Sequence, residues 1–151
     1  MVDTNVVVGS LLGSSGASRA LMRRCLERRC LPIMGEALFH EYCDVVRRPV
    51  MARSPLSEGE RLEFVEAFFS VCEWVSVFYL WWPNLADEGD NHLVELAVAG
   101  MAGSIVTRNA RDFRGGQLRF PRVRIEDPGD FLKRARTAYG DDDDSDSRRE
   151  A

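Results

Sequence analysis

The chain has 151 residues and an ordinary globular composition, 45% hydrophobic and 29% charged, which suits one domain that folds without disulfides. No apolar run approaches the ~20 residues of a membrane-spanning helix, and no basic segment precedes an apolar one at the N-terminus, so a cytoplasmic location is expected. The net charge of −4 is local, because six of the 24 acidic and two of the 20 basic residues lie in residues 141–151.

The first quarter of the chain alternates short apolar runs with a helical pattern. Residues 2–8 form a β-type run that polar residues interrupt, and we expect a strand to end near Asp3. Glycine and serine at residues 13–16 indicate a loop. A helix is predicted to begin at Ser18, and residues 31–34 are a second short strand.

Two amphipathic helices are expected next. Apolar side chains recur on one helical face of residues 36–48, and Pro49 stops that helix. Ser57 and Glu60 have the spacing of a capping box, so a second helix should run from there to about Cys72.

The second half continues the alternation. Residues 74–82 are aromatic and β-branched, so they can form either a strand or an apolar loop. The remaining expected elements are a helix around Leu93 to Gly100, strands at residues 104–107 and 122–126, a closing helix at residues 128–136, and an acidic, disordered tail at residues 137–151. Helices alternating with short buried strands predict an α/β sandwich around a parallel sheet.

The cysteines and histidines show no metal-ligand spacing. Cys25, Cys30, Cys43 and Cys72 lie in expected helices without a Cys-x-x-Cys pair, which favours reduced thiols. A zinc site would need His40 and His92, and neither stands at i, i+4 from another candidate ligand. Zinc is therefore not expected.

Four acidic residues stand at expected strand ends or near the apolar faces of expected helices, where water does not fully surround a carboxylate. Asp3 follows the first strand, at the edge where parallel sheets gather ligands. Glu41 lies at the rim of its helix's apolar face, and Asp90 lies on the apolar side of the next helix. Asp112 follows a strand across a short polar turn. Burying an unpaired carboxylate is costly, so such groups are paired, neutralised or bound to a metal.

Each acid taken singly also has a structural explanation. Asp90 can cap a helix, Glu41 can pair with Arg47 or Arg48, and Asp112 can cap a turn. Caps alone explain the set of four less well. Other phosphate chemistry fits poorly, because Asn5 stands where an aspartyl phosphatase has a second Asp, and no Gly-rich phosphate loop is present.

Three segments, in this order and at these distances, resemble the PIN domain family. They are Val-Asp-Thr-Asn-Val at residues 2–6, Asp-Glu-Gly-Asp-Asn-His-Leu at residues 87–93, and Ile-Val-Thr-Arg-Asn-Ala-Arg-Asp-Phe at residues 105–113. Glu-Tyr at residues 41–42 and Arg-Arg-Pro at residues 47–49 resemble the branch of toxin–antitoxin toxins related to VapC. The likeness covers about residues 1–133, which makes residues 1–136 the expected domain.

The resemblance implies a Rossmann-like α/β/α sandwich with a short central parallel sheet, and an endoribonuclease that leaves a 3′-hydroxyl and a 5′-phosphate. The positions that match metal-binding acids are Asp3, Glu41, Asp90 and Asp112; those that match supporting polar residues are Asn5, Thr107 and Asn109, and Asp87 adds a fifth acid. Carboxylate ligands without His or Cys favour Mg²⁺ or Mn²⁺. The implied partners are RNA, a second copy of the chain and a cognate antitoxin.

Two features leave alternatives open. Relatives have several apolar residues before the Asp-Thr-Asn motif, whereas only Met1 and Val2 precede it here. The first strand should therefore be nearly absent, which a misassigned start codon would explain. A weakened strand can misplace Asp3, and this favours the alternative of a catalytically weak module that binds RNA or protein. Residues 74–82 are a candidate contact between copies, although burial in the core is the favoured explanation.

Overall fold

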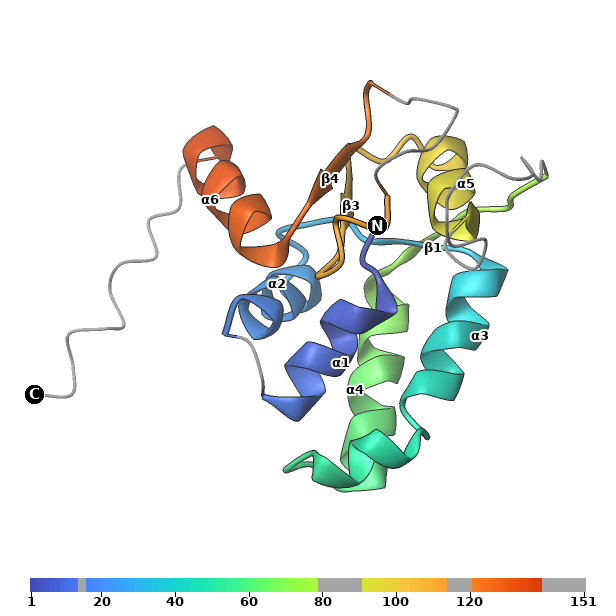
Figure 1. The fold of residues 1–151 in the computed structure, drawn as a ribbon, viewed down its shortest axis with the longest axis vertical. Coiled ribbons are helices and arrows are strands. Elements are labelled where there is room, and N and C mark those ends of the chain that lie inside the picture. Colours follow the sequence, from blue (N-terminus) through green and yellow to red (C-terminus); the bar gives the residue numbers. More distant parts are fainter. Residues whose placement is uncertain (14–15, 79–90, 114–120, 140–151) are drawn as a thin grey trace, which may run out of the picture.

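Helices and very short strands alternate along the chain. The structure is a computed structural model that describes residues 1–13, 16–78, 91–113 and 121–139 (Figure 1). The elements in chain order are α1 (Thr4–Leu12), α2 (Gly16–Leu26), β1 (Ile33–Met34), α3 (Glu36–Val45), the 3-10 helix η1 (Pro49–Arg53), α4 (Glu58–Val71), β2 (Glu73–Trp74), α5 (Asn91–Ala99), β3 (Ser104–Val106), β4 (Arg124–Glu126) and α6 (Pro128–Tyr139).

The strands pair in parallel, as predicted, but as two separate pairs within the described residues. β1 pairs with β2, and β3 pairs with β4. The expected first strand is reduced to an isolated parallel bridge between Val2 and Val106. The Asp3 amide donates to the Val106 carbonyl at 2.9 Å, and the Val106 amide donates to the Met1 carbonyl at 2.9 Å. The chain therefore enters beside β3, and Asp3 lies where that pairing ends.

The valines after Asp3 are helical, so the β-type interpretation of residues 2–8 is wrong beyond that point. The Asp3 side chain caps α1 by accepting from the Asn5 amide, and Gly13, with a φ of 69°, ends the helix. Val6 and Val7 are fully buried in the core. A local cap and core packing thus outweigh the β-propensity of the valine run.

The predicted capping box of α4 is confirmed. The Ser57 hydroxyl accepts from the Glu60 amide at 3.3 Å, and the Glu60 carboxylate accepts from the Ser57 amide at 2.7 Å. α3 ends at Val45, three residues earlier than expected, because the chain tightens into turns before Pro49. The closing helix α6 is longer than expected and extends to Tyr139.

The core takes buried side chains from the helices α1 to α5 and from the strands. Of these helices, α1, α3 and α4 sit together on one side of the strands (Figure 1). Tyr42 and Phe68 stack there with ring centroids 5.7 Å apart. The favoured core burial of residues 74–82 is wrong for two of them, because Trp74 is 55% exposed and Phe78 is 85% exposed. Residues 79–82 lie outside the described part of the chain.

All four cysteines are free thiols, as the missing Cys-x-x-Cys spacing predicts. Among the described helices, none is both long and apolar enough to cross a membrane.

Candidate active site

Asp3 sits where the chain turns from the bridge with β3 directly into α1. Its backbone is extended, with φ −75° and ψ 149°, and its side chain occupies the N-cap position of the helix. The helix dipole favours a negative charge there. The side chain is only 6% exposed. The sequence thus places a buried carboxylate at the carboxyl end of a parallel strand pair, as the Asp-Thr-Asn motif predicts.

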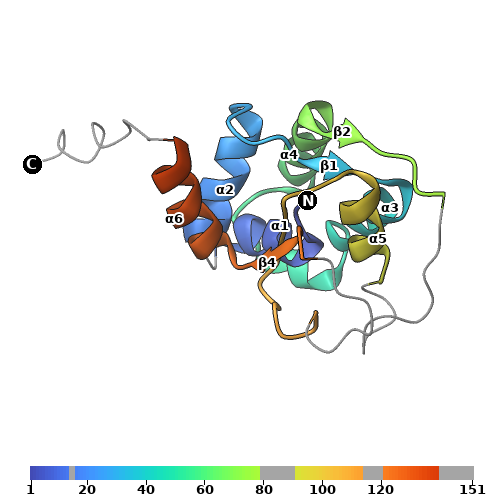
Figure 2. The same cartoon turned by 90° about the horizontal axis from the view of Figure 1, so that it is seen from above.

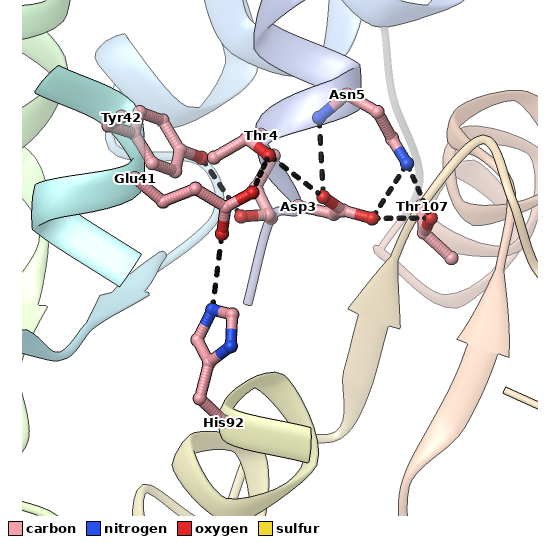
Figure 3. Close-up of polar contacts among 8 residues, drawn as sticks. Asp3, Thr4, Asn5, Glu41, Tyr42, His92 and Thr107 are labelled. Atoms are coloured by element: carbon pink, nitrogen blue, oxygen red, sulfur yellow. Dashed lines mark hydrogen bonds and ion pairs between the residues drawn. The ribbon is translucent and has the colours of Figure 1, made fainter. Parts of the chain in front are cut away.

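One oxygen of Asp3 is held by two short hydrogen bonds (Figure 3). Asp3 Oδ2 accepts from Asn5 Nδ2 at 2.7 Å and from the Thr107 hydroxyl at 2.6 Å. Thr107 Oγ1 in turn accepts from Asn5 Nδ2 and from the Asn109 amide, both at 3.0 Å. The Asn5 side-chain oxygen accepts from the Arg108 amide at 2.9 Å. The network uses the hydrogen-bonding groups of Asn5 and Thr107 and fixes the orientation of the carboxylate.

The other oxygen of Asp3 is bonded more weakly. Asp3 Oδ1 lies 3.2 Å from the Asn5 amide and 3.3 Å from Thr4 Oγ1. The Thr4 hydroxyl has one proton and also lies 2.7 Å from Glu41 Oε1, the shorter and therefore favoured contact. Asp3 Oδ1 consequently keeps lone-pair capacity for a ligand.

Glu41 brings a second carboxylate from α3 to the same place. Besides Thr4, it contacts His92 of α5, whose Nε2 lies 3.2 Å from Glu41 Oε2 (Figure 3). The close contact with His92 holds the pKa of Glu41 below its ordinary value; the Thr4 hydrogen bond acts in the same direction, against the effect of burial. Thr4 therefore bridges two carboxylates that come from different helices.

The electrostatics of Asp3 point to a missing positive charge. Burial raises the pKa of its carboxyl, hydrogen bonds from Thr107 and Asn5 oppose the rise, and the nearby charge of Glu41 adds to it. No lysine or arginine side chain in the described residues contacts the Asp3 carboxylate. A buried carboxylate beside a second one is stabilised by a bound cation, and an all-oxygen pair suits a hard divalent ion.

The other predicted acids do not complete a cluster in the described residues. Asp112 is exposed in the turn after β3, where its amide donates to the Asn109 carbonyl at 3.0 Å. Across the described ranges, no three His, Cys, Asp or Glu side chains lie close enough together to hold one metal ion. Asp87 and Asp90 fall outside those ranges. Asp90 stands two residues before His92 in the sequence.

Three residues at the site were not predicted. Thr4 links Asp3 to Glu41, His92 contacts Glu41, and the Tyr42 hydroxyl donates to the Val2 carbonyl at 2.9 Å. Thr4 and Tyr42 each stand next to a predicted acid in the sequence, which was the available signal. The spacing of His92 in the sequence argues only against a zinc site, and a contact with a carboxylate of another helix leaves no local pattern.

The fold and the site together define the class of protein. It is an α/β domain with short parallel strands and a pair of carboxylates at a strand end. Within that class, a profile of the PIN domain matches residues 1–111, and the chain belongs to the PIN domain family. PIN domains are generally nucleases and usually use divalent metal ions. Comparisons with curated proteins and with solved structures found no match.

Proposed function

We propose that this PIN domain is a metal-dependent endoribonuclease and the toxin of a type II toxin–antitoxin pair. The observation that carries the nuclease proposal is the buried Asp3 carboxylate, held in one orientation by Asn5 and Thr107 while its other oxygen keeps free capacity. Glu41, joined to it through Thr4, supplies the second acid. The toxin role rests on the likeness of residues 41–49 to that branch.

In this proposal Asp3 and Glu41, with Asp90 and Asp112, would hold Mg²⁺ or Mn²⁺. The described residues suit this ion class, because the donors are carboxylate oxygens and no lysine or arginine side chain among these residues contacts the buried Asp3 carboxylate. Such an ion supplies Lewis-acid stabilisation of the phosphate charge and activates water for attack.

The chain's own residues position the reaction. Asn5 and Thr107 keep the Asp3 carboxylate from rotating, and His92 and Thr4 do the same for Glu41. Water adds to phosphorus in line as the bond to the 3′ oxygen breaks, and a proton passes to that oxygen. The products are a 3′-hydroxyl and a 5′-phosphate. No side-chain nucleophile is required.

The test is Mn²⁺-dependent cleavage of a broad panel of RNAs by the purified chain. Asp3→Asn keeps the size of the side chain but removes its charge, so cleavage should fall by at least about 100-fold. The matched control is Glu126→Gln, which removes a carboxylate away from the site. Full activity in Asp3→Asn contradicts the proposed site.

The same variants test the finer parts of the proposal. Wild type that cuts no RNA on the panel in Mn²⁺ or Mg²⁺ would favour a module that only binds RNA or protein. Induction in a bacterial host should arrest growth with wild type and not with Asp3→Asn; normal growth with an active wild type would indicate a nuclease that is not a toxin. A mass measurement in solution tests the proposed homodimer.

A further inference from the structure

Two large aromatic side chains are exposed on the segment that begins with β2. Trp74 ends β2 and is 55% exposed, although its ring packs against Phe39 at a centroid distance of 5.4 Å. Phe78, four residues on, is 85% exposed. Exposed aromatic rings forfeit the stabilisation that burial gives, and neighbouring ones mark a surface that binds something.

These rings border a cleft. It has a volume of about 710 Å³ and is lined by Gly35 and the first turns of α3, by residues 74–78, and by three residues of α5, which are His92, Glu95 and Leu96. Figure 2 shows the chain after β2 running past α3 and α5. The volume lies within the roughly 300–1,000 Å³ of pockets that take a small organic group.

One residue, His92, separates the cleft from the acidic site. His92 lines the cleft, and its Nε2 lies 3.2 Å from Glu41 Oε2. A group bound against His92 in the cleft is therefore separated from the Glu41 carboxylate by the imidazole ring. One substrate molecule could therefore place one group in the cleft and the neighbouring group, the one that is cut, at the carboxylates.

The charges of the cleft decide which part of a nucleotide it fits. Its carboxylates in the described chain are Glu36 and the buried Glu95, its basic side chains are those of His40 and His92, and no lysine or arginine of that part lines it. Without a lysine or arginine, this lining does not favour phosphate. Aromatic faces stack on any base, and carboxylates accept hydrogen bonds from amino groups on base edges. Charge complementarity thus favours an uncharged ring that carries an amino group.

We propose that this cleft binds one unpaired, amino-bearing nucleobase of RNA, stacked on Phe78 and next to the phosphate that is cut. The proposal rests on the proposed ribonuclease function and deepens it by naming the substrate class. A base in the cleft must have left the base stack, which single-stranded RNA permits at low cost and a duplex does not. Adenine, cytosine and guanine qualify, whereas uracil lacks the amino group.

The experiment measures fluorescence anisotropy of labelled oligo(A), oligo(U) and an RNA duplex with the wild type and variants, in Ca²⁺, with intact RNA verified on gels. Phe78→Ala should weaken oligo(A) binding by about five- to 150-fold, the range for one stacked base. Phe78→Tyr keeps the stacking face and should bind as wild type does. Leu31→Ala is the matched control, because Leu31 is 68% exposed and does not line the cleft.

Support requires that oligo(A) binds more tightly than oligo(U) and that duplex binding is insensitive to Phe78→Ala. Unchanged oligo(A) affinity in Phe78→Ala overturns the cleft proposal. If Phe78→Ala also converts a dimer to a monomer while it keeps its RNA affinity, the cleft is an interface between copies, and the proposal is overturned as well. If either of these results is found and the wild type still cleaves RNA in Mn²⁺, only the cleft proposal fails. A wild type that neither binds nor cleaves any RNA removes the proposed function as well.

Discussion

Two carboxylates beside β3 have opposite surroundings. Glu126 of β4 accepts two hydrogen bonds from the Arg134 guanidinium, both at 2.8 Å, and one from the Ser104 hydroxyl at 2.6 Å. Burial alone would raise the pKa of Glu126, but Arg134 and Ser104 hold it below its ordinary value. Asp3 accepts only from neutral donors, and its pKa is raised.

The difference separates a carboxylate that has its counter-charge within the protein from one that has none among the described residues. Glu126 has its counter-charge on α6, so its ion pair joins β4 to that helix. Asp3 has a second carboxylate nearby instead, reached through Thr4. Oriented but uncompensated negative charge binds a cation, whereas a satisfied ion pair does not.

The largest expected effect is on metal-linked stability. Mn²⁺ at 100 times its dissociation constant should stabilise wild type by about 2.7 kcal/mol, a rise in Tm of roughly 5–10 °C. Asp3→Asn should show no such rise, because it removes the charge that we propose binds the ion. Glu126→Gln should keep the rise although its own Tm is lower. Differential scanning fluorimetry with and without EDTA measures all three, and an equal rise in Asp3→Asn would refute the comparison.

Local signals explain what the sequence predicts well. The Ser57 and Glu60 capping box is confirmed because both partners lie within one helical turn. Asp3 was expected at a strand end, and the bridge of Val2 with Val106 puts it there despite the short first strand. The Asp-Thr-Asn motif encodes the contacts of Asp3 with its own neighbours.

Relations between elements could not be predicted in this way. The contact of His92 with Glu41 depends on how α5 packs on α3, which no pattern within either helix specifies. Hydrophobicity predicted burial for Phe78, which the structure places in solvent. Hydropathy measures the free energy gained when a side chain is buried, but it does not show whether the chain itself or another molecule buries that side chain.

An intermediate effect is expected from the residues that orient Asp3. Thr107→Val keeps the shape but removes the donor at 2.6 Å from Asp3 Oδ2 and the acceptor used by Asn5 and Asn109. We expect a loss of Mn²⁺ affinity of about 10- to 100-fold and of RNA cleavage in proportion. Isothermal titration calorimetry measures the affinity. Thr107→Ser restores the hydroxyl and should recover it; equal affinity in the Val variant means the network does not position Asp3.

The smallest effect on stability is expected at the ion pair between Glu126 and Arg134. Arg134→Met keeps the aliphatic bulk but removes the cation, and the Arg134 side chain is 35% exposed, so the loss of stability should be only about 1 kcal/mol. A carboxyl whose pKa is lowered on folding contributes stability above its unfolded pKa and loses it as pH falls through the folded value. The difference between wild type and variant should therefore be full at neutral pH and shrink below roughly pH 4.3.

Urea denaturation at several pH values measures that difference, and Mn²⁺ titration of the same variant sharpens the comparison. Because Glu126 already has its counter-charge, the ion pair should take no part in metal binding, and Arg134→Met should bind Mn²⁺ as wild type does. A joint loss of Mn²⁺ affinity would mean that the two carboxylates are coupled through β3, since Ser104 contacts Glu126 while the other end of the strand holds Asp3.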